Sequence, residues 1–234
     1  MDKYQIIAII AGILLLLLII VLNSRNRIIR TYNKYMKLDN QLNITGEQLA
    51  VLSKKLLGLD DLKFALTKYK LGDAYSPKYR TLILSEEVCK TASLASLTIV
   101  SHELGHAMQD KQNNPLFIFT RILGKLVRLT NKLIMPILVV GLFLFVFQYP
   151  VLDSGYIMLI ISGCLFALQV LNQIVTIPLE YDASNRALKF LKTNKLVTTA
   201  ELRKAKKLLG IAAQTYIASL FDGIFIFNFK RKKN

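Results

Sequence analysis

Cysteine and histidine are scarce in this sequence, and their scarcity limits the metal sites that the chain can form. The 234 residues include two cysteines, Cys89 and Cys164, and two histidines, His102 and His106. Cys89 falls in a segment expected to be cytoplasmic and Cys164 in an expected membrane span, so we expect no structural disulfide. No cysteine pair has the spacing of a zinc ribbon. Any metal site must therefore combine histidine with carboxylate ligands.

Acidic residues are also few, and the chain is strongly basic. It has 31 lysine and arginine residues against 15 aspartate and glutamate residues, which gives a formal net charge of +16. A nucleic-acid partner would explain this charge, but no recognition motif accompanies it, so we expect no nucleic acid. The basic residues instead gather beside long apolar segments, where they would face anionic lipid. The sequence contains no internal repeats and no low-complexity linkers.

Long apolar runs make up much of the 53% hydrophobic content, which excludes an ordinary soluble domain. Residues 4–22 hold no charge and are long enough to cross a bilayer. A cleaved signal peptide is the alternative, but the run is too long and no small-residue cleavage site follows it. Residues 133–149 and 155–177 are predicted as two further spans that form a transmembrane hairpin. Pro136 is tolerable within such a helix.

The distribution of lysine and arginine predicts the orientation of these spans. Basic residues follow the first span, precede the second and follow the third, whereas the connector 150–154 has none. By the positive-inside rule, the N-terminus is outside, and both the segment between the first two spans and the chain after the third are cytoplasmic. We therefore expect a multi-pass protein of the plasma membrane, in contact with the lipid bilayer.

Local signals predict a mainly helical membrane protein with a small β-hairpin or edge strand. Thr45 and Gln48 fit a capping box that begins a helix over residues 45–58. Residues 62–68 and 80–85 are short strand candidates separated by turn residues. Residues 91–112 are typical of a long, buried helix.

The C-terminal part is expected to be helical as well. Residues 179–192 are predicted as a helix, and Thr198 with Glu201 begins another through a capping box. We interpret the apolar residues 212–229 as a helix that lies against the other spans or at the membrane interface. The predicted organisation is an anchor (1–23), a cytoplasmic segment (24–132), a transmembrane hairpin (133–177) and a C-terminal helical segment (178–234).

The segment SHELGHAMQD, residues 101–110, places both histidines of the chain in one H-E-x-x-H pattern. His102 and His106 are four residues apart, so on a helix both rings project from one face and can share an ion. Glu103 lies on a neighbouring face, from which it can take a proton from metal-activated water and later give it to the leaving amine. A chance match on a solvated or core helix is the alternative. We predict a zinc site of the zincin type with Glu103 as the general base.

A catalytic zinc site needs a third protein ligand and keeps its fourth position open. Because no other histidine exists, the third ligand must be a carboxylate. Glu180 is favoured, because it follows the third span and is succeeded by small residues at i+3, i+4 and i+7 that would pack closely on the motif helix. Asp182 lies about 200° further around the helix, and we expect it to pair with Arg186. Asp182 and Asp222 remain alternative ligands, and Glu180 could instead be a solvated acid near Pro178.

Three stretches together resemble a known family: SHELGHAMQ, IPLEYDASNRAL and AAQTYIASL. The chain resembles the membrane-bound neutral zinc metallopeptidases of the YugP type over nearly its whole length. These look like relatives of the HtpX-like and CAAX-prenyl-type proteases, in which an E-x-x-A-D segment supplies the third ligand. The resemblance implies that Glu180 is this ligand, with Ala183 matching the pattern. Ser184 stands where relatives have an aspartate that orients a ligand histidine, and Asp182 is a candidate to replace it.

Three further residues are candidates for contact with a substrate. Residues 80–85 precede the motif helix, and a sheet edge in that place could bind an extended peptide by strand addition. Leu82 and Leu84 would then contact the substrate, or else simply pack on the helix. Tyr75 could donate a hydrogen bond to the oxyanion of the reacting carbonyl, although loop tyrosines are more often structural.

These observations favour a membrane-anchored zinc endopeptidase that cuts peptides or membrane proteins at the cytoplasmic surface. One alternative is an intramembrane protease of the site-2 type, with Asp222 in the FDG sequence as the third ligand. Another is a non-enzymatic membrane scaffold stabilised by its metal, although structural zinc sites usually have four protein ligands.

Overall fold

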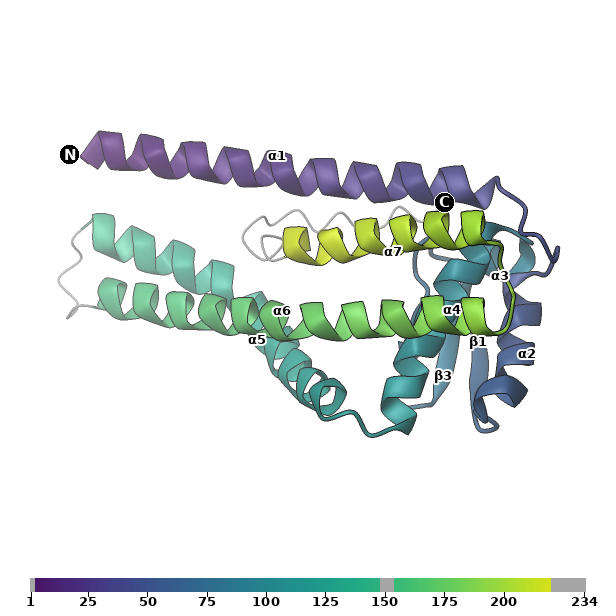
Figure 1. The fold of residues 1–234 in the computed structure, drawn as a ribbon. Helices are drawn as coiled ribbons and strands as arrows, with labels where there is room; N and C mark the ends of the chain where they lie inside the picture. The colour runs from purple at the N-terminus through teal and green to yellow at the C-terminus, as the bar shows by residue number, and fades with distance from the viewer. Residues whose placement is uncertain (1–2, 148–153, 220–234) are drawn as a thin grey trace. The chain divides into compact units, whose positions relative to one another are not determined.

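The computed structural model describes residues 3–147 and 154–219, and it is mainly helical with one small sheet (Figure 1). The high helix content and the small sheet agree with the fold class that the sequence predicts. In chain order the elements are α1 (Lys3–Met36), α2 (Gly46–Leu57), β1 (Lys63–Thr67), β2 (Ala74–Ser76), β3 (Thr81–Ser85), α3 (Glu86–Lys90), α4 (Leu94–Lys111), α5 (Pro115–Val146), α6 (Ser154–Thr193) and α7 (Thr199–Ser219).

The chain divides into two compact units. The sheet unit consists of residues 24–117 and 178–214 and contains the three strands and the H-E-x-x-H segment. The hairpin unit consists of residues 1–23, 118–177 and 215–234 and contains most of α5 and the first part of α6. Each of α1, α5, α6 and α7 contributes residues to both units.

The sheet has the strand order β1-β3-β2, with β3 parallel to β1 and antiparallel to β2. The sequence predicted β1 and β3 but missed β2, because a strand of three residues between turn residues has no periodicity to detect. The hairpin of the sheet is formed by β2 and β3. The prediction that residues 80–85 form a sheet edge is wrong, since β3 is the middle strand and is paired on both sides.

Both predicted capping boxes are present. Thr45 precedes α2, accepting from the backbone N–H of Gln48, while the Gln48 side chain accepts from the backbone N–H of Thr45. Gly58 ends α2 in the left-handed conformation with φ 59°. Thr198 and Glu201 make the same reciprocal contacts before α7. These ends were predictable because a cap depends only on residues within one turn of each other.

Two helices among the described residues are long and apolar enough to cross a membrane: α5 and α6. The segments predicted separately as residues 155–177 and 179–192 are one continuous helix, α6, which includes Pro178. The first predicted span lies in α1, and its crossing of the membrane stays a prediction. Of the apolar C-terminal segment, residues 212–219 belong to α7, and residues 220–229 lie outside the described residues.

The two membrane-type helices approach each other closely within the hairpin unit. A Cβ atom on Gly155 of α6 would lie 2.6 Å from the backbone nitrogen of Phe145 in α5. Only glycine permits this distance, so the backbones of α5 and α6 are in direct contact there. Small residues at helix interfaces are the usual means of close packing in membranes.

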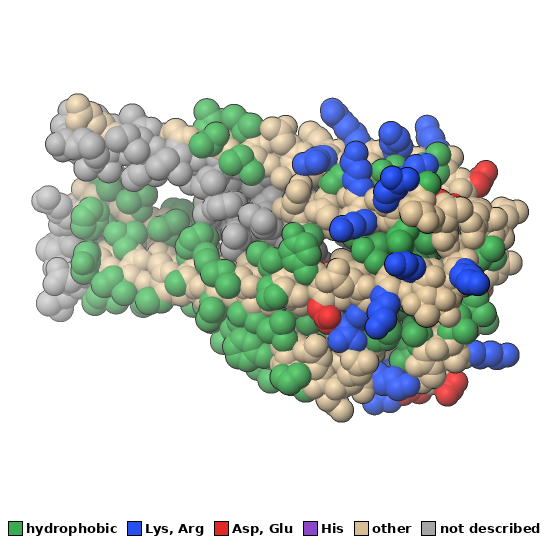
Figure 2. All heavy atoms as spheres, in the orientation of Figure 1, with side chains coloured by type: hydrophobic (Ala, Val, Ile, Leu, Met, Phe, Trp, Pro, Cys, Tyr) green, Lys and Arg blue, Asp and Glu red, His purple; other side chains and the backbone are tan. Residues whose placement is uncertain are grey.

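Hydrophobic and basic side chains are exposed on different helices (Figure 2). Large hydrophobic side chains are exposed along α5 and the first part of α6, including Leu129 at 73% and Phe143 at 53%. Lysine and arginine side chains gather on the C-terminal half of α1, on α7 and on the end of α6, where few acidic side chains lie among them. Exposed apolar helices of this kind are typical of contact with lipid.

Candidate metal centre

Helix α4 holds the H-E-x-x-H segment in the core of the sheet unit. Its N-cap, Ser93, accepts a hydrogen bond from the backbone N–H of Ser96 at 3.0 Å. Leu97, Val100 and Leu104, at i, i+3 and i+7, are fully buried and fix one face of the helix against the core. The rotation of α4 about its axis is thereby set, and both histidines point toward α6.

Helix α6 lies unusually close to α4 at the motif itself. A Cβ atom on Gly105, the residue before His106, would lie 2.5 Å from the carbonyl oxygen of Ala183. Ala183 and Ala187 are fully buried at this contact. The small residues that follow Glu180 in the sequence therefore do pack closely, and the backbone of α4 reaches that of α6 where only glycine fits.

This contact brings Glu180 between the two histidines. Oε2 of Glu180 is 3.1 Å from Nε2 of His102 and 3.4 Å from Nε2 of His106. Among the residues that the structure describes, these three form a group whose possible ligand atoms all lie within 4.8 Å of one another. Whether the group suits a metal ion depends on the chemistry of its donor atoms and on the distances between them.

The donor set and its spacing fit zinc. Two imidazole nitrogens and one carboxylate oxygen are usual ligands of a catalytic zinc site. With zinc–ligand distances of about 2.0–2.2 Å, the ligands of a tetrahedral ion lie roughly 3.3 Å apart. The two measured separations, 3.1 and 3.4 Å, bracket that value. These two separations suit a shared ion, and the ligand atoms of the two histidines lie within 4.8 Å of each other.

The other nitrogen of each histidine is held by a polar side chain. Nδ1 of His102 lies 3.2 Å from Oγ of Ser184, and Nδ1 of His106 lies 3.0 Å from Oε1 of Gln109. A hydrogen bond at Nδ1 leaves Nε2 available as the ligand atom and fixes the direction of the ring. Ser184 thus contacts His102 at the ring nitrogen that does not face Glu180.

Gln109 is fully buried, and its orientation is determined by its partners. Its Nε2 donates to the carbonyl of Leu179 at 3.0 Å and to the carboxylate of Asp182 at 2.8 Å. Because both partners accept, Oε1 must be the atom that faces His106, and Nδ1 of His106 must carry the proton. The sequence motif did not single out Gln109, although its position three residues after His106 on the same helix was a usable signal.

Asp182 is outside the group of three possible ligands. Its carboxylate accepts from Nε of Arg186 at 2.7 Å, as predicted, and it also holds Gln109. Asp182 therefore acts on His106 through Gln109. Asp222, the other alternative ligand, lies outside the described residues.

Glu103 lies beside the three residues and is held by the sheet. The backbone N–H of Tyr75 in β2 donates to its Oε2 at 2.8 Å. Burial raises the pKa of the Glu103 carboxyl above its usual range, although the charges of His102 and His106 lower it in part. The raised pKa makes this carboxylate a better proton acceptor than an exposed glutamate.

The pKa of His106 is raised above its ordinary value by its surroundings. Burial by itself would lower the pKa of His106, but the hydrogen bond and charge of Glu180 raise it to about 9. A metal ion and a proton thus compete for the same imidazole. The protonated His106 and the carboxylate of Glu180 form a buried ion pair.

The remaining predicted residues have other surroundings. The hydroxyl of Tyr75 donates to Asp110 at 2.8 Å, so its contact with a reacting carbonyl, which stays a prediction, would require it to leave Asp110. Leu82 and Leu84 are buried in the core at 0% and 3% exposure. The structure agrees with the alternative that they pack in the core, because the middle strand of the sheet directs both side chains there, and their contact with a substrate stays a prediction.

Comparison with known proteins agrees with this geometry. Residues 9–228 match the family described as "Putative neutral zinc metallopeptidase". The chain is also similar to "Putative membrane protease YugP" of Bacillus subtilis (strain 168), with 28% identity over 195 residues, which is 83% of this chain and 82% of that protein. No solved structure matches significantly. The family match covers most of the chain, and the protein therefore belongs to this neutral zinc metallopeptidase family.

Proposed function

We propose that this protein is a membrane-anchored zinc endopeptidase that hydrolyses peptide bonds of polypeptide or membrane-protein substrates at the cytoplasmic face of the plasma membrane. The observation that carries the proposal is the convergence of His102, His106 and Glu180 on one point, with Glu103 beside them. The family match and the similarity to a protein named as a membrane protease support it.

In this proposal His102, His106 and Glu180 would hold zinc and would leave one ligand position to water or substrate. When bound, zinc supplies a Lewis acid that lowers the pKa of water and polarises a carbonyl. Gln109 and Ser184 hold the two imidazole rings so that both Nε2 atoms face Glu180, where the ion would bind.

Glu103 moves the proton. The amide of Tyr75 holds Oε2, which leaves Oε1 to accept the proton of the attacking water. The same carboxyl then donates that proton to the nitrogen of the leaving amine, so that the peptide bond breaks without release of a free amide anion. Its partial burial beside β2 keeps bulk water from competing for the proton.

The membrane location rests on the apolar helices α5 and α6, whose exposed side chains suit lipid. The cytoplasmic side is supported by the distribution of charge, since the basic residues flank the predicted spans and the connector 150–154 lacks them. A first span in α1 would complete a three-span protein with its N-terminus outside.

The test is the zinc content of the detergent-purified protein, measured beside that of Glu180→Ala, Asp222→Ala and Glu103→Gln. We expect about one zinc per chain in the wild type, loss of zinc with Glu180→Ala, and retention with the other two variants. Loss with Asp222→Ala alone would instead favour the site-2 arrangement.

Peptide hydrolysis by the same preparations separates an enzyme from a scaffold. Wild type should cleave an unstructured protein substrate such as casein, and Glu103→Gln should not, although it retains zinc. Absence of cleavage by both proteins, with zinc bound in both, would contradict the catalytic proposal and leave a structural metal site. Equal cleavage by both would contradict the role of Glu103.

A further inference from the structure

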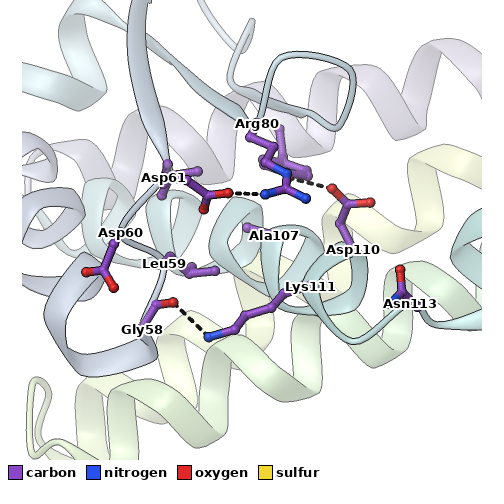
Figure 3. A pocket seen from close by; sticks show the side chains of 11 residues that line it. Gly58, Leu59, Asp60, Asp61, Arg80, Ala107, Asp110, Lys111 and Asn113 are labelled. Carbon is purple, nitrogen blue, oxygen red and sulfur yellow. Dashed lines mark hydrogen bonds and ion pairs between the residues drawn. The ribbon is translucent and has the colours of Figure 1, made fainter.

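A cavity of about 370 Å³ lies beside the last turns of α4, outside the metal centre (Figure 3). Three parts of the sheet unit form it: the loop between α2 and β1, the hairpin of β2 and β3, and α4 from Ala107 onward. Leu59, Leu62 and Ala107, each at least nine-tenths buried, form an apolar part of its wall, and polar groups line the larger part. Its volume is within the range of about 300–1,000 Å³ found for ligand sites.

The cavity is on the same side of α4 as Glu103. Glu103, Ala107 and Asp110 occupy i, i+4 and i+7, which share one helix face. With a rise of about 1.5 Å per residue, Ala107 and Asp110 are roughly 6 and 10 Å along the axis from Glu103. Tyr75 contacts both Glu103 and the wall of the cavity, because its backbone N–H donates to Glu103 and its hydroxyl donates to Asp110.

The charged groups that line the cavity carry a net negative charge. Three are acidic and two are basic: Asp60, Asp61, Asp110, Arg80 and Lys111. Both basic side chains already have partners within the protein. Arg80 is paired with Asp61, and the ammonium of Lys111 donates to two backbone carbonyls at 3.1 and 2.7 Å, where it caps the C-terminal end of α2 (Figure 3). The electrostatic balance of the cavity therefore favours a positively charged ligand.

We propose that this cavity binds a lysine or arginine side chain of the substrate polypeptide. The apolar part of the wall would contact the aliphatic part of such a side chain, and the carboxylates of Asp60 and Asp110 would bind its cationic end. An acidic side chain would be repelled by the same two groups. An extended peptide advances about 3.3 Å per residue, so the distance from Glu103 corresponds to two or three residues from the bond that is cut.

The inference rests on the proposed peptidase function, and its test separates the two. Fluorescently labelled peptides that differ only in a lysine, norleucine or glutamate two or three residues from a central Leu-Leu bond are bound to zinc-loaded Glu103→Gln in detergent. Fluorescence anisotropy gives the affinities, and cleavage of the same peptides by wild type gives the rates. Asp60→Asn with Asp110→Asn removes both charges while the asparagine can still accept from Tyr75. Glu86→Gln is the control, because Glu86 is exposed and pairs with Lys90 outside the cavity.

We expect the lysine peptide to bind about tenfold more tightly than the glutamate peptide, as befits two partly exposed ion pairs. The double variant should lose this preference, and Glu86→Gln should keep it. Equal affinities for the three peptides in Glu103→Gln, or a preference that survives in the double variant, would overturn the inference. A preference that depends on Asp60 and Asp110 without any cleavage by wild type would uphold the cavity as a site for basic side chains and overturn the peptidase.

Discussion

Replacement of Gly105 by alanine tests whether the close approach of α4 and α6 builds the metal centre. The new Cβ atom would lie 2.5 Å from the carbonyl oxygen of Ala183. Real Cβ contacts essentially never fall below 3.0 Å, and nine in ten lie beyond 3.4 Å, so the two helix backbones must separate by about 0.5–0.9 Å. Glu180 belongs to the backbone that moves, whereas His102 and His106 belong to the other.

The expected result is a loss of metal affinity that exceeds the loss of folding stability. Ligand distances in metal sites tolerate changes of about 0.2 Å, so the displacement should weaken zinc binding at least about tenfold. Overpacking costs roughly 1–3 kcal/mol, but alanine gains up to about 1 kcal/mol over glycine within a helix. The variant should therefore still fold.

The assay is competition for zinc with a chromophoric chelator, combined with thermal unfolding of the metal-free protein. Gly210→Ala is the matched control, since Gly210 is also within a helix and a Cβ atom there would have no neighbour within 4 Å. It should bind zinc as wild type does and be slightly more stable. Unchanged zinc affinity in Gly105→Ala, with a folded protein, would refute the argument that this contact positions Glu180.

Four other outcomes follow from the same structure. Gln109→Ala should lower zinc affinity about 10- to 100-fold through the loss of its bond to His106, whereas Gln112→Ala, which removes only an exposed partner of Arg186, should not. Zinc affinity should rise up to about tenfold per pH unit from pH 6.5 to about 9, because the raised pKa of His106 means that zinc must displace a proton from it. Chelator titrations at several pH values measure this, and an affinity independent of pH would contradict it. In the metal-free protein, the stability contributed by the His106–Glu180 pair should be fully present below pH 6.5 and be lost as the pH rises through about 9, as thermal unfolding at several pH values would show. Thr45→Ala should reduce the unfolding free energy by about 1 kcal/mol through loss of the cap of α2, measured by denaturant unfolding.

Features of the protein that depend only on residues close together in the sequence were predictable. The two histidines share a helix face because helical spacing places residues four apart on one side. The caps at Thr45 and Thr198 depend on side chains three residues away. The apolar lengths of α5 and α6 follow from composition alone. The choice of Glu180 over Asp182 also relied on helical rotation, and the structure places Glu180, not Asp182, beside the histidines.

The arrangement of these parts was decided by tertiary structure. No local signal states that β3 pairs with β1 on one side and β2 on the other, because strand order is a property of contacts between distant segments. The packing of Leu82 and Leu84 in the core depends on this strand order. Gln109 gained its role only when α6 supplied two acceptors for its amide group, Leu179 and Asp182.

The sequence by itself determined which residues could bind a metal. The packing of Gly105 against Ala183 brought them to one point, because backbone contact at that distance requires the absence of a side chain on one helix and a small one on the other.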